Sequence, residues 1–559
     1  MSPSTSDTLL SDQQQAITIK CSNDSSRVKV DFIRRIPTEL LCTVLSHLDP
    51  NHLVTECLLV SQLWRERLLH CPKVWSQIRV DRMEFSPRAL LLVGKYIQLL
   101  KVHHCGGRWF TMLFEYMIAG AFPKLRTLKL SPMGRYHIDQ RVTEEGLRHL
   151  QGSLKTLCIE CPAGTLLNLQ SIFTSCPQLI TLDFWHTAGL GIYDPLPYMA
   201  SLTTLTVVQR TTVLSEEPLQ RIVDACPNLQ RLSLRLCEPS QMAFLVRSLP
   251  KLEILYFNNY GASAFAKDPI TTDNQPTTIQ DQQPVGLQHL VADAMHIPDL
   301  IEVLQTHCST LETLVLDMTG STGNEWSQIE RLLERPLNMI KLHTLEYDAQ
   351  YMDHGENVLE WLLAGCTALE KVQISRVYDT TNDDDDDETH HSHQNTILFQ
   401  HLSRMSRLKY LSLQDIDNVD GLEEYARHLG SLGSACPLES LMLHECMLTD
   451  RHLNVLGKIR TLKNINILYP DDCISTTALN RFFSRHHHGS SVLARVKLFA
   501  VNCATRDTLA AIGKMPALES LLLYFHGGSR ISKQDAVEFA EQHPHVNLKC
   551  FGRHFEESQ

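Results

Sequence analysis

The chain has 559 residues, 43% hydrophobic and 20% charged, a balance that excludes a wholly disordered or collagen-like protein. Its 51 basic and 63 acidic residues give a net charge of −12, so no basic excess indicates a nucleic-acid-binding protein. The longest apolar stretches, such as residues 90–93, are far shorter than the roughly 20 residues of a membrane-spanning helix, so we expect no membrane insertion.

The first 29 residues are rich in Ser, Thr, Asp and Gln, which predicts a disordered polar N-terminus. They lack the basic start and the apolar run of a secretory signal. We therefore expect the protein in the cytoplasm, the nucleus or both. A reducing compartment would keep most of the 17 cysteines as thiols.

Residues 30–80 predict a small helical unit. Pro37 stands where a helix would begin, and one helical face then collects Leu40, Leu41, Val44, Leu45 and Leu48. Asp49-Pro50 would end this helix, and a second apolar group follows, made of Leu53, Cys57, Leu58, Val60, Leu63 and Trp64. A unit of this size cannot bury every apolar side chain internally, so part of its surface requires a partner.

This segment resembles an F-box. The family pattern has Leu-Pro-x-Glu, an amphipathic helix ending in Leu-Asp-Pro, then a Leu, a Val, a Trp-Arg pair and a downstream Trp. The matching residues are Ile36-Pro37-Thr38-Glu39, Leu48-Asp49-Pro50, Leu53, Val60, Trp64-Arg65 and Trp75. Ile36 in place of the usual Leu conserves the side-chain volume.

The resemblance implies docking onto the Skp-family adaptor of a cullin-RING ubiquitin ligase. It assigns contact or supporting roles to Ile36, Pro37, Glu39, Leu40, Leu41, Leu45, Leu48, Leu53, Val60 and Trp64. The alternative is that these helices only cap the repeats that follow, because the ends of a repeat array need covering.

Residues 81–119 leave two possibilities open, a helical linker or a degenerate first repeat. From residue 120 to residue 552, the pattern Leu-x-x-Leu-x-Leu recurs about fifteen times. The copies begin at Leu125, Leu154, Leu179, Leu202, Leu229, Leu252, Leu287, Leu311, Leu342, Leu369, Leu408, Leu438, Leu462, Leu493 and Leu518. The 393 residues between the first and last starts span fourteen intervals with a mean near 28, which lies in the leucine-rich-repeat range.

Each copy predicts a short strand, because its last two apolar residues alternate with polar ones. A single strand cannot bury its own apolar face, so the copies must stack in parallel with the returning segments behind the sheet. The returning segments read as helices. Ser215 would start one with Leu219, Ile222 and Val223 on a single side, and Ser532 with Asp535 indicates a capping box at another.

A cysteine precedes several copies, at Cys176, Cys226, Cys308, Cys366 and Cys436. A catalytic thiol has no reason to recur at the repeat spacing, whereas a small buried residue between helix and strand does, so we assign these cysteines a structural role. The repeat resembles the leucine-rich repeats of F-box proteins. The resemblance implies an α/β fold, a ribonuclease-inhibitor-like horseshoe with a parallel sheet on its concave face.

The residues that alternate with the buried ones would face the open side of the sheet and form a binding wall. In the early strands they include Trp185, Arg231, Arg235 and Tyr256, of types that dominate interface energetics. In the middle they turn acidic, and we call Asp293, Asp317, Glu346 and Asp348 the acidic stripe. The stripe would favour a basic segment of a protein substrate, and the alternative is a solvated face without a role.

Flexible insertions are expected near residues 262–285 and 379–396, and a polar tail at residues 553–559. The second insertion contains Asp383 to Asp387 and several histidines, but such low-complexity tracts lack the preorganised spacing of a metal site. A third loop holds His486, His487 and His488. No zinc-ligand, phosphate-loop or nucleophile-elbow motif occurs, so we expect neither metal, nor cofactor, nor active site.

An F-box followed by leucine-rich repeats is the arrangement of substrate-recognition subunits of SCF ubiquitin ligases. The resemblance therefore implies a non-catalytic adaptor that presents an unidentified protein substrate for ubiquitination. Two other hypotheses stay open, a repeat scaffold outside the ubiquitin system and an enzyme that uses a Cys or His of the repeats.

Overall fold

The computed structural model describes residues 35–552 except 46, 49–52, 58–59, 82–86, 133–138, 162–166, 187–189, 191, 193–194, 210–212, 259–285, 294, 319–325, 350–354, 376–390, 417–419, 471–472, 489–490 and 525–529. The predicted disordered N-terminus, the first insertion, most of the second and the C-terminal tail lie outside these residues. The chain divides into two compact units, Met1–Trp75 and Ser76–Gln559.

The N-terminal unit consists of short helices, α1 (Thr38–Leu45), η2 (Leu53–Cys57) and α4 (Gln62–Leu69). Its interior holds Leu41, Cys42, Leu45, Leu53, Leu68 and Trp75. The indole N–H of Trp75 donates to the carbonyl of Leu68 at 2.7 Å, so this large buried ring is also satisfied as a donor. Arg67 ties α4 to the start of α1, because its guanidinium donates to the carbonyl of Ile36 at 2.8 Å and to Thr38 Oγ1 at 3.1 Å.

The second unit is a solenoid of strand–helix repeats around one parallel sheet of eighteen strands, in which each strand pairs with the next along the chain. The strands are β1 (Gln77–Asp81), β2 (Leu99–Cys105), β3 (Thr127–Pro132), β4 (Thr156–Cys161), β5 (Thr181–His186), β6 (Thr204–Gln209), β7 (Arg231–Arg235), β8 (Ile254–Asn258), β9 (His289–Asp293), β10 (Thr313–Asp317), β11 (Thr344–Asp348), β12 (Lys371–Ser375), β13 (Tyr410–Gln414), β14 (Ser440–His444), β15 (Asn464–Leu468), β16 (Arg495–Phe499), β17 (Ser520–Tyr524) and β18 (Asn547–Phe551).

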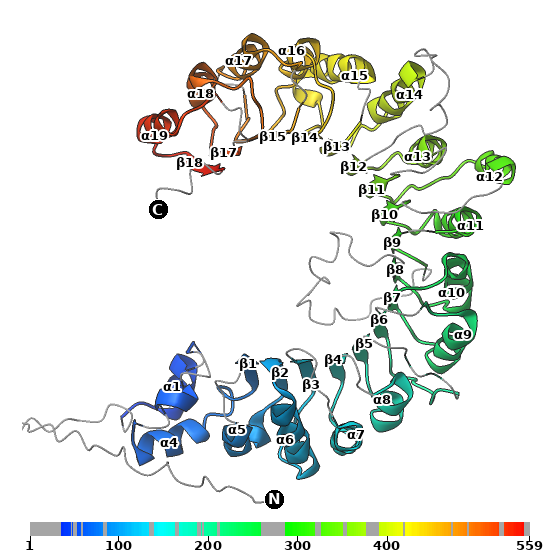
Figure 1. Ribbon diagram of the computed structural model, residues 1–559, viewed down its shortest axis with the longest axis vertical. Helices are drawn as coiled ribbons and strands as arrows, with labels where there is room; N and C mark the ends of the chain where they lie inside the picture. The colour runs from blue at the N-terminus through cyan, green and yellow to red at the C-terminus, as the bar shows by residue number, and fades with distance from the viewer. Residues whose placement is uncertain are drawn as a thin grey trace, which may run out of the picture. The chain divides into compact units, whose positions relative to one another are not determined.

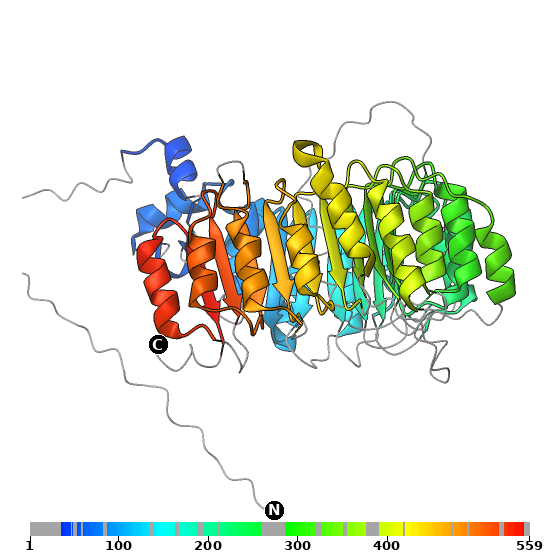
Figure 2. The same cartoon turned by 90° about the horizontal axis from the view of Figure 1, so that it is seen from above.

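Helices cover one face of this sheet and leave the other face, which we call the inner face, on the concave side of the unit (Figure 1). They are α5 (Pro87–Val93), η4 (Gly94–Tyr96), α6 (Gly107–Ile118), α7 (Gln140–His149), α8 (Leu169–Ser175), α9 (Glu216–Ala225), η5 (Pro239–Gln241), α10 (Met242–Ser248), α11 (Ile297–His307), α12 (Trp326–Leu333), α13 (Gly355–Ala364), α14 (His391–Ser403), α15 (Asp420–Ser431), η7 (Gly433–Ala435), α16 (Asp450–Leu456), α17 (Thr476–Ser484), α18 (Arg506–Gly513) and α19 (Lys533–Gln542). The later helices, yellow to red, stand side by side in one layer (Figure 2).

The core runs between the sheet and the helix layer as columns of apolar side chains in register. One column on β14–β17 contains Leu441, Ile465, Val496 and Leu521, and a parallel one contains Leu443, Ile467, Leu498 and Leu523. All eight side chains are at most 2% exposed. Full burial of such a side chain contributes about 1.5–3 kcal/mol, so the stacked columns account for the repeat spacing of leucines.

The fifteen copies found in the sequence form β3 to β17, and three further strands extend the sheet beyond them. Ile97 stands 28 residues before Leu125 and opens the copy that forms β2, and Val546 stands 28 residues after Leu518 and precedes β18. Residues 81–119, read as a linker or a degenerate repeat, contain α5, β2 and α6. The sheet begins at Gln77, inside the range predicted for the N-terminal helices.

The two helices expected from individual residues are present. α9 begins directly after Ser215 and buries Leu219, Ile222 and Val223, as the sequence predicts. α19 begins with the predicted capping box, in which Ser532 and Asp535 exchange hydrogen bonds. α14 begins at His391, so the end of the segment predicted as the second insertion is helical. Within the described residues, no helix is long and apolar enough to cross a membrane.

The strand ends share an unusual backbone feature. Leu236, Asp415, Glu445, Tyr469 and Ala500 each follow a strand directly and have φ between 47° and 62°, a conformation that costs a non-glycine residue about 1–2 kcal/mol. At the last four, the N–H donates to the carbonyl of the final residue of the next strand, at 2.7–2.9 Å. These bonds continue the ladder past the strands and fix the side chains at their ends.

Candidate functional site

The N-terminal unit exposes several apolar side chains. Leu40, Val44 and Val60 are each 58–60% exposed, and Leu48 is 45% exposed. Leu40 and Val44 are one helical turn apart on α1, beside the buried Leu41 and Leu45. These four side chains are the exposed apolar set of the N-terminal unit.

The residues predicted for adaptor binding therefore divide into two groups. Leu41, Leu45 and Leu53 are buried and support the helices, and Ile36 and Trp64 are partly buried. The exposed group is Pro37, Glu39, Leu40, Leu48 and Val60. Val44 is an exposed apolar residue that was not among the residues assigned to the adaptor, although its helical spacing from Leu40 and Leu48 could have identified it.

The early part of the inner face mixes aromatic, basic and acidic side chains. Trp185 on β5 donates its indole N–H to the carboxylate of Asp183, whose pKa is raised by burial and partly lowered again by this bond and by Lys129. Arg235 lies two strands further on in the same row as Trp185, because the register joins both residues through Val208 of β6.

Arg231 and Tyr256 occupy other rows of the same region. Arg231 is exposed at the start of β7, and Tyr256 on β8 lies beside Ser233 of β7. Partial burial raises the pKa of the Tyr256 hydroxyl. The structure thus places all four predicted early residues on the inner face, but spreads them over three strands and three rows.

The acidic stripe is brought together by the register but is mostly withdrawn from solvent. Asp293, Asp317 and Asp348 are direct neighbours on β9, β10 and β11, one strand spacing apart. Asp293 and Asp348 are only 6% exposed. These two side chains of the stripe therefore have little contact with solvent.

The backbone beyond two strands of the stripe continues the hydrogen-bond ladder of the sheet. The backbone that leaves these strands stays close to the sheet, because Met318 N–H donates to the Asp348 carbonyl at 2.6 Å and Ala349 N–H to the Ser375 carbonyl at 3.3 Å. Glu346 lies in the next row, and its Oε1 forms an ion pair with Lys371 Nζ. The stripe therefore offers a partner less free charge than its composition suggests.

The late part of the inner face has a different character. β16, β17 and β18 present nine inward residues, which we call the β16–β18 face: Arg495, Lys497, Phe499, Ser520, Leu522, Tyr524, Asn547, Lys549 and Phe551. Three are cations, three are aromatic and none of the nine is a carboxylate. The alternation within the Leu-x-x-Leu-x-Leu copies predicts that Arg495, Lys497, Phe499 and Tyr524 face inward. It gives no such prediction for Lys549 and Phe551, because the apolar pattern of β18 is degenerate.

The aromatic row of this face is ordered by stacking. The rings of Phe499 and Tyr524 lie 5.2 Å apart with an interplanar angle of 6°. Phe551 follows Tyr524 in register and is 48% exposed. His444 occupies the same row on β14, and its ring forms a tilted pair with Tyr469, which follows β15, with the ring centroids 5.7 Å apart.

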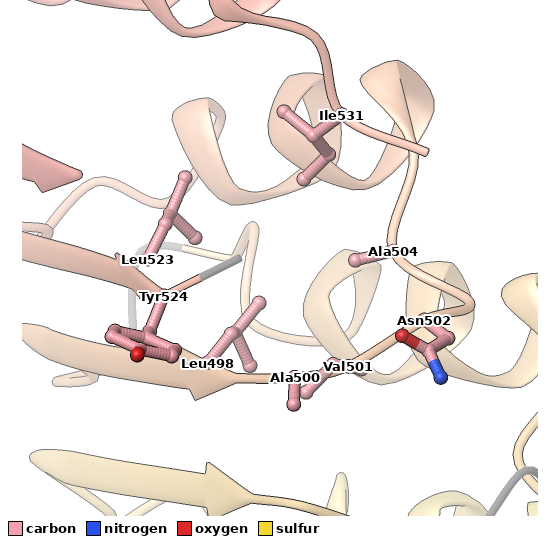
Figure 3. A pocket seen from close by; sticks show the side chains of 8 residues that line it. All are labelled: Leu498, Ala500, Val501, Asn502, Ala504, Leu523, Tyr524 and Ile531. Carbon is pink, nitrogen blue, oxygen red and sulfur yellow. The ribbon is translucent and has the colours of Figure 1, made fainter. Parts of the chain in front are cut away.

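A small hollow lies at the carboxyl ends of β16 and β17, next to Tyr524 (Figure 3). Apolar side chains line most of it, including Leu498, Leu523 and Ile531. Its volume of about 10 Å³ is close to the lower limit for one water molecule, so it cannot enclose a metabolite.

Several thiols and one imidazole of the repeats are buried. Burial raises the pKa of Cys176, Cys226 and Cys366 to about 12, so these thiols stay protonated at neutral pH. His486 is fully buried, and its Nδ1 lies 2.9 Å from Ser491 Oγ. In the part of the chain that the structure describes, no three His, Cys, Asp or Glu side chains form a group that could hold a metal ion.

No family model matches this chain, and no curated protein matches it. Among solved structures, it is similar to a chain in the crystal structure of the Rad7 and Elc1 complex from yeast, at 13% sequence identity and a TM-score of 0.29. The similarity covers 93% of this chain and 92% of that chain. A TM-score this low supports no argument about function, which must rest on the residues themselves.

Proposed function

We propose that the protein is the substrate-recognition adaptor of an SCF-type ubiquitin ligase, with an N-terminal F-box and leucine-rich repeats. The observation that supports this proposal best is the exposed apolar set on the N-terminal unit, Leu40, Val44, Leu48 and Val60. These residues lie in the segment that carries the F-box pattern. Each side chain that becomes buried in a Skp-family adaptor would contribute about 1–2 kcal/mol to binding.

The buried residues of the same unit would position this surface. Leu41, Leu45 and Leu53 pack beneath the exposed set, and Arg67 holds the start of α1 through the Ile36 carbonyl. A preorganised surface binds more tightly than a flexible one, because less conformational entropy is lost on association. Pro37 would contribute in the same way by restricting the backbone at the helix start.

The proposed mechanism is proximity. The N-terminal unit would bind the ligase core, and the repeats would bind a protein substrate, so that substrate lysines reach a high effective concentration near ubiquitin. Such a mechanism requires no reactive residue in this chain. The raised pKa of the repeat cysteines agrees with that role, because a protonated thiol is a weak nucleophile.

Binding of the full-length chain to a purified Skp-family adaptor tests the proposal. Replacing Leu40 and Val44 together by Asp should weaken binding by about a hundredfold, because two carboxylates would face an apolar partner surface. Both side chains are exposed, so the midpoint of thermal unfolding should not change.

The matched control replaces Val492 and Val537 by Asp, two similarly exposed residues of the repeat unit. This variant should bind the adaptor as the unmodified chain does. If the unmodified chain does not bind, or if both variants lose binding equally, the N-terminal helices only cap a repeat scaffold.

A further inference from the structure

We infer that the β16–β18 face is a docking site for an acidic, extended segment of a partner protein that carries an aromatic or proline ring. This inference rests on the proposed function, since it names the class of substrate segment that the repeats would bind. The site lies away from the acidic stripe and selects the opposite partner charge.

Charge is the first argument. Lys497 and Lys549 lie in one row, separated by Leu522 of β17, and Arg495 lies two residues before Lys497 on the same face of β16. All three cations are exposed. Within the described residues, neither lysine forms an ion pair, and Arg495 has only a long one, 3.8 Å from Glu519.

Three cations and no carboxylate among the nine residues give this face a local positive charge. A partner that supplies carboxylates would gain complementary contacts. Such contacts act mainly on the rate of encounter and on specificity.

The neighbouring row supplies the apolar part of the site. Phe499 and Tyr524 are already stacked, which lowers the entropy cost of ordering them around a ligand. Phe551 offers a half-exposed ring beside them. A ring from the partner would therefore lie on the row of aromatic side chains.

The composition of the chain favours a protein partner over a nucleic acid. Cations beside aromatic rings also occur in proteins that bind single-stranded nucleic acids. Such proteins usually carry a basic excess, whereas this chain has a net charge of −12, and the middle of the same inner face is acidic. A long polyanion that extended beyond β16–β18 along the inner face would be repelled there.

The test selects peptides on the immobilised full-length chain from a displayed random library of about 12 residues, a length that crosses three strands when extended. We expect the retained peptides to be rich in Asp and Glu and to contain an aromatic residue or a proline. One retained peptide is then synthesised and its affinity is measured by fluorescence anisotropy.

Replacing Lys497 and Lys549 together by Glu should weaken this affinity by about tenfold or more, and the loss should shrink at high salt. Phe551→Ala should weaken it by about fivefold through lost ring contact. The matched control reverses Lys458 and Lys514, two exposed lysines that follow α16 and α18, and should leave the affinity within about twofold.

The inference is overturned if no peptide is retained, if the retained peptides show no acidic excess, or if the control reversal weakens binding as much as Lys497→Glu with Lys549→Glu. Tighter binding of an oligouridylate probe of similar length would also overturn it, in favour of a nucleic acid. The Leu40→Asp and Val44→Asp variant separates the two proposals, because it should lose the adaptor and retain the peptide.

Discussion

The middle and the late strands of one sheet use the same repeat pattern and present different inner faces. On β9–β11, the carboxylates are either almost fully buried, as at Asp293 and Asp348, or paired, as at Glu346. On β16–β18, Lys497 and Lys549 stand exposed without an ion pair among the described residues. A position that faces the open side of a solenoid is therefore available to a partner only where the local packing leaves it exposed.

The largest effect should come from reversing a buried charge of the middle strands. Asp348→Lys should lower the free energy of unfolding by about 3 kcal/mol, because the new cation would lose its hydration at a position that is 6% exposed. Lys497→Glu should change it by less than about 0.5 kcal/mol, since this side chain is exposed. Urea unfolding of both variants measures the difference, and equal shifts would contradict the contrast.

Acid should weaken the late repeats through His486, which follows α17. Burial, and secondarily the nearby Arg460, His487 and Arg485, lower the pKa of His486 from 6.5 to about 4. The unfolded chain then binds a proton below pH 6.5 that the folded chain does not bind until about pH 4. Stability should therefore fall by up to about 1.4 kcal/mol per pH unit within this window.

His486→Asn should remove much of this pH dependence, because the amide cannot be protonated in the window. His343→Asn is the matched control, since the His343 side chain on the middle strands is about half exposed. Its unfolding midpoints, measured from pH 6.5 to pH 4.5, should follow those of the unmodified chain. A variant at position 486 that keeps the full pH dependence would show that other groups cause it.

Removing one tyrosine hydroxyl should also affect the two regions differently, with a smaller change in the free energy of unfolding. The Tyr347 hydroxyl is buried in the middle repeats and donates to the Gly355 carbonyl at 2.6 Å. Tyr347→Phe should cost about 1–2 kcal/mol in urea unfolding, because the carbonyl loses its partner inside the protein. Tyr524→Phe should cost almost nothing, since the stacked ring is retained. Equal costs would mean that the two hydroxyls are equivalent.

The smallest effect should come from the ion pair of the middle strands. Glu346→Gln removes the partner of Lys371 and should cost about 0.5–1 kcal/mol, less at high salt, because the Lys371 side chain is 40% exposed. Lys497→Gln removes a cation for which no ion pair is described, so it should leave the free energy of unfolding unchanged. Unfolding in low and high salt compares the two, and a salt-independent loss at position 346 would contradict the electrostatic origin.

Much of the fold could be predicted from the sequence, because the spacing of the apolar residues follows the strand–helix repeat directly. The Leu-x-x-Leu-x-Leu copies specify β3 to β17, whereas the copies that form β2 and β18 are too degenerate to recognise in isolation. The F-box resemblance and the role of its residues stay predictions, since no comparison tests them.

The candidate site was harder to predict from the sequence than the fold. The alternation showed that Asp348 faces the inner side, but its burial depends on the segments around it in the fold, which no local pattern encodes. The stacking of Phe499 on Tyr524 likewise depends on the register between two strands 25 residues apart. Residue type and periodicity predict the face of a strand, whereas exposure and pairing require the neighbouring strands.

The row on β16–β18 also constrains the conformation of whatever lies across it. Lys497 and Lys549 are two strands apart, as are Phe499 and Phe551, and two strand spacings amount to about 9.6 Å. A left-handed polyproline helix advances about 9.3 Å per turn of three residues, so one of its edges would meet every second strand. In a fully extended chain, side chains on one side repeat about every 6.8 Å. Such a chain would be out of register with every second strand after two repeats. The strand spacing itself thus favours a ligand with one anchoring side chain in every three.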